Sequence, residues 1–106
     1  MIIHVANNLP DRPLERYEGE QFRNKFLLPA LEKSAPTETI LIDFDGKWVG
    51  DYNMGFLKGI FDTPPEDYTR QQFFDKLKFK TIEKPLLVAT IAAITLDVNL
   101  TEVWDD

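Results

Sequence analysis

Two aspartates separated by one residue are the side chains best placed for chemistry in this sequence. Asp43 and Asp45 stand at the end of an apolar run, and Gly46 follows them directly. Carboxylates can act as nucleophiles and as general acids or bases. The same residues also suit a strand that enters an Asp-Gly turn, because tight turns favour both residue types. We favour this structural interpretation and keep the acid chemistry as an alternative.

The run from Leu41 to Gly46 resembles the first motif of haloacid-dehalogenase-type phosphatases, an apolar strand that ends in Asp-x-Asp-Gly. The resemblance implies Asp43 as the nucleophile, Asp45 as the acid/base, and Mg²⁺ held by carboxylates at the strand end. Such an enzyme also needs a Ser or Thr, a Lys and a second acidic pair on further strands, and we can place none of these. A Mg²⁺-dependent phosphatase is therefore an alternative, and we predict that the chain is not an enzyme.

Other chemistries lack the residues that they require. His4 is the only histidine and the chain has no cysteine, so neither a histidine pair nor a thiolate is present to bind a metal. The glycines lack the spacing and the terminal Gly-Lys-Ser/Thr of a phosphate-binding loop. We interpret His4 as an ordinary strand residue, and we predict no catalytic residue, no cofactor and no metal site.

Length and charge limit the partners. A chain of 106 residues with eight Phe, two Trp and three Tyr is expected to fold as one domain, 1–106, with 101–106 frayed. The net charge of −6 disfavours nucleic acid, because nucleic-acid binding depends on Lys and Arg contacts to phosphates. A third possibility is a small acidic inhibitor from a mobile element that mimics nucleic acid, which would gather negative charge on one face.

No targeting or membrane segment is apparent. The N-terminus has no basic region followed by an apolar stretch, so we expect a cytoplasmic protein. The longest low-charge segment, Pro85 to Leu96, is shorter than the roughly 20 residues that span a bilayer. We therefore predict no membrane association.

The first half of the chain predicts strand, helix and strand. Residues 2–6 have β-branched character and precede a turn, which favours a short strand. Residues 8–18 have the charges and prolines of an exposed loop. Residues 18–33 have helical apolar spacing, with a kink or early stop predicted before Pro29. The continuous apolar run 39–44 is typical of the central strand of an α/β sheet.

The pattern of the second half predicts two helices, a strand and a last segment that could be either helix or strand. Apolar spacing favours helices from about 51 to 61 and over 66–76, followed by a strand at 78–82. Pro85 suits the first position of a helix, but Val88 and the β-branched residues after it would also suit a strand. The order predicts a single layered α/β domain.

Lys76, Lys78 and Lys80 alternate along the chain. In a strand they would share one face, and lysines on an edge strand oppose aggregation. We interpret all three as a solvated edge rather than an anion site.

Several short elements together resemble the STAS-like domain-of-unknown-function family. They occur in the family's order and spacing from about residue 2 to residue 82. The elements are Arg16-Tyr17, Gly19-Glu20-Gln21-Phe22-Arg23, Leu27-Leu28-Pro29-Ala30-Leu31, Ile42-Asp43-Phe44-Asp45-Gly46 and Val49-Gly50. The resemblance implies a STAS-like fold, a small mixed β-sheet backed by about four helices.

By analogy with anti-sigma-factor antagonists, the resemblance also implies a non-catalytic regulatory module that docks onto an ATPase-like kinase. Where those antagonists have a phosphorylated Ser or Thr, this sequence has Gly50-Asp51-Tyr52. Asp51 cannot be phosphorylated by a Ser/Thr kinase, which favours a permanently committed binder over a switch, although Asp51 can equally be a helix cap. The predicted partner-binding residues are Gly50, Asp51, Tyr52, Asn53, Arg16, Tyr17 and Trp48.

Overall fold

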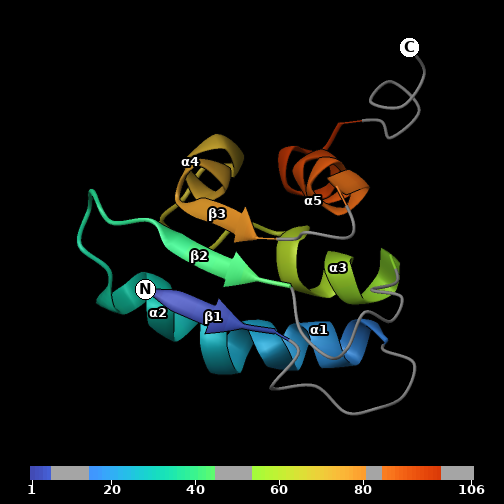
Figure 1. The fold of residues 1–106 in the computed structure, drawn as a ribbon, viewed down its shortest axis with the longest axis horizontal. Helices are drawn as coiled ribbons and strands as arrows, with labels where there is room; N and C mark the ends of the chain where they lie inside the picture. The colour runs from blue at the N-terminus through green and yellow to red at the C-terminus, as the bar shows by residue number, and fades with distance from the viewer. Residues whose placement is uncertain (6–14, 45–53, 81–84, 99–106) are drawn as a thin grey trace.

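The computed structural model describes residues 1–5, 15–44, 54–80 and 85–98. Strands and helices alternate along these ranges in the order expected of an α/β protein (Figure 1). The elements are β1 (Ile2–His4), α1 (Arg16–Phe22), the π-helical segment η2 (Arg23–Leu27), α2 (Leu28–Lys33), β2 (Ile40–Asp43), α3 (Met54–Phe61), α4 (Arg70–Asp75), β3 (Leu77–Lys80) and α5 (Pro85–Leu96).

The three described strands form one sheet in the order β1-β2-β3. Ile42 pairs with Ile3 on one side and with Phe79 on the other, which confirms the prediction that 39–44 contains the central strand. Both pairings are parallel, and Figure 1 shows the three arrows running the same way. The mixed pairing that the resemblance implied does not occur among these strands.

The sheet order explains where the core lies. Parallel strands need crossover connections, which are nearly always right-handed, so two successive steps in the same direction place their helices on the same face. Consistent with this, α1 and α3 pack against each other. The core face of the sheet presents the alternate side chains Ile3, Val5, Ile40, Ile42, Phe44 and Leu77, all of which are buried. The predicted α/β arrangement, a small sheet backed by helices, is therefore confirmed for the described residues.

The region around Pro29 shows how the helix tolerates a proline. The sequence predicts a kink or an early stop. The chain stays helical from α1 through η2 to α2, so the stop does not occur, and a π-helical segment interrupts the α-helix directly before Leu28 instead. The backbone N–H of Leu28 donates to the carbonyl of Arg23, five residues earlier, and Pro29 then occupies the first turn of α2, where its missing N–H costs little.

Two predicted boundaries are also wrong. The loop assigned to 8–18 ends earlier, because Arg16 and Tyr17 already belong to α1. The helix assigned to 66–76 begins only at Arg70, because Thr69 caps it: the Thr69 side chain accepts from the backbone N–H of Gln72, whose side chain in turn accepts from the backbone N–H of Thr69.

The last segment is a helix, which settles the choice left open by its sequence. Leu87, Ile91 and Ile94 are buried, as the helical interpretation predicts. Thr95 fits the helix because its hydroxyl donates to the carbonyl of Ile91 at 2.7 Å. No helix in the described part of the chain is long and apolar enough to cross a membrane. The cytoplasmic location and the single domain stay predictions.

Lys76 is not the edge residue that the alternation of lysines predicted. It lies before β3 and is 9% exposed, and its ammonium donates to the carbonyls of Ala35 and Pro36. Lys78 and Lys80 are exposed on β3, as predicted. Alternation misled here because the first lysine belongs to the end of α4 and not to the strand.

Candidate partner-binding surface

Two of the seven predicted partner-binding residues lie in the described part of the chain. Arg16 and Tyr17 occupy the first turn of α1. The other five, Trp48, Gly50, Asp51, Tyr52 and Asn53, lie outside the described residues, and so do Asp45 of the alternative phosphatase site and the chain end from 101 to 106. The described part of the predicted binding surface is therefore the first turn of α1, held by the elements that pack against it.

Tyr17 presents an aromatic ring to solvent. Its side chain is 63% exposed, the largest exposure among the large apolar and aromatic residues described. Its hydroxyl accepts a hydrogen bond of 2.8 Å from Nε2 of Gln21, one turn later. An exposed aromatic side chain held in this way loses little conformational entropy when a partner covers it.

Arg16 is engaged inside the molecule. Its Nη1 lies 2.9 Å from Oδ2 of Asp62, just after α3, and its Nε lies 3.6 Å from Oε2 of Glu20. The hydrogen bond with Asp62 is the main cause of the raised pKa of Arg16. The guanidinium therefore joins α1 to the end of α3, and its predicted contact with a partner stays a prediction.

A second arginine of the same helical unit holds the same end of α3. Arg23 donates to the carbonyls of Ile60, at 3.3 Å, and Thr63. Cations near a helix C-terminus satisfy its free carbonyls and oppose its dipole. Burial lowers the pKa of Arg23, whereas the nearby carboxylates of Asp62 and Glu20 favour its charged form.

Asp62 completes this cluster. Partial burial alone would raise the pKa of Asp62, but hydrogen bonds from Arg16 and Thr63 and the charges of both arginines outweigh it, so the pKa is lowered. The contacts of Arg16 and Arg23 with Asp62 and the end of α3 were not predicted. At least 37 residues separate the arginines from the end of α3, and no local pattern links them.

Two glycines let α1 and α3 approach closely. A Cβ atom on Gly19 would lie 2.2 Å from the carbonyl oxygen of Phe56, and one on Gly59 would lie 2.4 Å from that of Arg16. Real Cβ atoms do not occur at such distances, so both positions require glycine. The close contact fixes Tyr17 relative to α3, and residues 50–53 directly precede α3 in the chain.

His4 and Asp43 form a pair at the carboxyl ends of β1 and β2. The two residues are opposite each other in the β1–β2 register, and Nδ1 of His4 lies 2.9 Å from Oδ2 of Asp43. His4 is a strand residue, as predicted. Among the described residues, no three His, Asp or Glu side chains are grouped so as to hold a metal ion. The phosphatase alternative stays an untested prediction.

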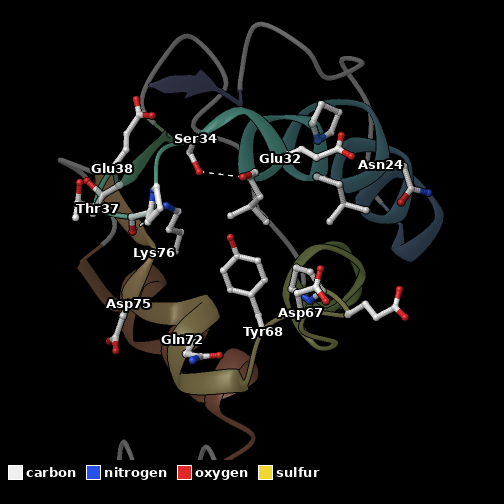
Figure 2. Close-up of a pocket in the computed structure, with 17 residues that line it drawn as sticks. Asn24, Glu32, Ser34, Thr37, Glu38, Asp67, Tyr68, Gln72, Asp75 and Lys76 are labelled. Carbon is white, nitrogen blue, oxygen red and sulfur yellow. Dashed lines mark hydrogen bonds between the residues drawn. The ribbon is translucent and has the colours of Figure 1, made fainter.

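A groove lies at the opposite end of the sheet, where β2 and β3 begin. It has a volume of about 1070 Å³, with α2 and residues 34–39 on one side and residues 65–76 on the other. Figure 2 shows Tyr68 standing in the middle of it, with its hydroxyl pointing towards α2. This groove could not be predicted from the sequence, because its walls are about 30 residues apart in the chain and no motif marks them.

Comparison with protein-family models gives a match. The family model for a STAS-like domain of unknown function (DUF4325) matches residues 18–87, about two thirds of the chain. No curated protein and no solved structure matches it. The matched range covers α1 from residue 18 onward and all of β2, α3, α4 and β3, so Arg16 and Tyr17 lie just before it.

Proposed function

The chain belongs to the STAS-like family, and from this premise we propose that it is a non-catalytic regulatory module that binds a protein partner. The proposed partner is a regulator of the ATPase-like kinase type. The proposed binding face combines the first turn of α1 with residues 48–53, which precede α3 in the sequence.

One observation carries the proposal: Tyr17 is an exposed aromatic on a helix whose position is fixed. Aromatic residues are over-represented among the few interface residues that dominate binding energy. Close packing at Gly19 and the ion pair of Arg16 with Asp62 tie α1 to α3. A partner that covers Tyr17 therefore meets a surface that is already ordered, which reduces the entropic cost of binding.

The absence of a phosphorylatable side chain at position 51 defines the proposed mode of action. Asp51 carries a permanent negative charge where a switched family member would have Ser or Thr. We propose that binding here is constitutive, so that the abundance of the chain, and not its phosphorylation, sets how much partner is held.

The test is affinity capture of the tagged chain from its native cells, with mass spectrometry of the captured proteins. The variants are Tyr17→Ala, Asp51→Ala and Tyr52→Ala, and Tyr17→Phe is the matched control because it keeps the ring. We expect an ATPase-like kinase that the unsubstituted chain and Tyr17→Phe retain and that Tyr17→Ala loses by about tenfold or more. Equal retention by all variants would remove this face from the proposal.

A further inference from the structure

The groove at the start of β2 and β3 has an apolar interior. Leu28 and Leu31 of α2 line one side, Pro65 and the ring of Tyr68 line the other, and the ring of Tyr68 packs edge-on against that of Phe73 at 6.5 Å. Tyr68 is only partly exposed, and it packs against the hydrophobic core. Apolar side chains of a ligand could therefore enter the groove and remain shielded from water.

The charges that line the groove are almost all negative. Its lining contains one lysine and the carboxylates of Glu32, Glu38, Glu66, Asp67 and Asp75. The ammonium of this lysine, Lys76, donates to the backbone carbonyls of Ala35 and Pro36. It therefore offers no neutralising partner to the acidic side chains.

Three of these carboxylates have no cation of their own within the described residues. Glu38 lies 3.5 Å from the N-terminal amine and Asp75 accepts from Gln71, but Glu32, Glu66 and Asp67 form no such contact in the described ranges. All three are exposed. Asp62, by contrast, is paired with Arg16 and lies near Arg23, whereas these three carboxylates have no such partner among the described residues.

Both walls of the groove are held in place. On one side, the backbone N–H of Glu38 donates to the carbonyl of Ala35 at 3.0 Å, and the backbone N–H of Ala35 donates to Oε1 of Glu38 at 3.1 Å. Lys76 ties this turn to the end of α4. On the other side, Thr69 caps α4, and Nη1 of Arg70 donates to the carbonyl of Asp62 at 2.8 Å. The groove is therefore formed before any ligand arrives.

We propose that this groove binds a short basic segment of a protein partner, in which Lys or Arg residues flank an apolar side chain. The apolar side chain would lie against Tyr68 and Leu31, and the basic side chains would meet Glu32, Glu66 and Asp67. Charge complementarity selects this occupant, because the same carboxylates repel phosphate groups of nucleic acids or anionic lipids. The inference goes beyond the proposed function and does not depend on it, because Tyr17 is not part of the groove.

The probe is an acetylated hexapeptide of alternating Arg and Leu, and its twin of alternating Glu and Leu is the peptide control. Binding to the isotope-labelled full chain is followed by NMR chemical-shift titration. We expect the basic peptide to shift amides of residues 31–38 and 65–76 and to bind less tightly as the salt concentration rises. The acidic twin should cause no shifts there.

Matched charge variants separate the groove from the overall charge of −6. Glu66→Gln with Asp67→Asn removes two groove carboxylates, and Glu15→Gln with Asp97→Asn removes two exposed carboxylates elsewhere. The groove pair should weaken binding by about fivefold, and the control pair should leave it nearly unchanged. Equal weakening by both pairs, or shifts outside the groove, would overturn the inference. Tyr17→Ala should bind the basic peptide normally, so failure of the proposed function would leave this result intact.

Discussion

The α1–α3 pair and the groove differ in whether their carboxylates are paired with cations. In the helix pair, Asp62 is neutralised by Arg16 and approached by Arg23, and the backbones touch at Gly19 and Gly59. In the groove, three exposed carboxylates have no cation among the described residues, and the only lysine of the lining is used by backbone carbonyls. Charges that are satisfied internally hold elements together, whereas unsatisfied charges around an apolar hollow are available to a partner.

The largest effect is expected at the helix contact. Gly19→Ala would place a Cβ against the backbone of Phe56, which cannot move as a side chain can, so the helices must separate. We expect a loss of about 3 kcal/mol or more in the free energy of unfolding. Urea unfolding measures it, with Lys58→Ala on the exposed side of α3 as the control. A near-wild-type midpoint for Gly19→Ala would mean that the helices do not pack as closely as described.

The second effect distinguishes a buried lysine from an exposed one. Lys76→Met keeps the aliphatic stem but leaves the carbonyls of Ala35 and Pro36 without their donor. We expect a loss of about 1–3 kcal/mol in stability, and almost none for the exposed Lys78→Met. Thermal unfolding of the two variants side by side measures the difference. Equal melting temperatures would indicate that Lys76 is solvated at the sheet edge, as its spacing in the sequence predicted.

A third, smaller effect tests the cap that starts α4 and shapes one wall of the groove. Thr69→Ala removes the side-chain oxygen that accepts from the N–H of Gln72. We expect a loss of about 1 kcal/mol, largely recovered in Thr69→Ser, which restores the hydroxyl. Chemical unfolding of both variants checks this, and an unaffected Thr69→Ala would show that the capping box contributes little.

The smallest effect is the pH dependence at Asp62. Because its folded-state pKa lies below the ordinary value of 3.8, its contribution to stability is present above that pH and is lost as the pH falls through the folded pKa. The effect is small because the side chain is 30% exposed and screened by solvent. Between pH 6 and pH 2.5, the free energy of unfolding should fall less steeply for Asp62→Asn than for the unsubstituted chain. An equal pH dependence for both chains would contradict the lowered pKa of Asp62.

Local patterns predicted most of the elements but few of the contacts between them. The run 39–44 could be predicted as a central strand because a continuous apolar segment must be buried on both sides. Residues 85–96 could not be decided, because a segment that is apolar all round has no helical face to read. The helix end predicted before Pro29 does not occur, because the preceding π-helical turn accommodates the proline. Local propensity does not encode such a turn.

The candidate sites show the same division. Tyr17 could be proposed from its residue type, and the structure describes it as exposed. The pairing of Arg16 with Asp62 and the burial of Lys76 depend on residues about 40 or more positions away, so spacing along the chain carried no signal for them. The groove depends on how two loops meet, which only the fold determines.

The most direct test of the account is a map of the surface that the captured kinase-type partner covers. Hydrogen exchange of the full chain would be measured with and without that partner. We predict slowed exchange in the first turns of α1, around Tyr17, and in residues 50–53, with no comparable protection on β3. Protection confined to other elements, or none at all, would contradict the proposal that this chain functions as a binding module through that face.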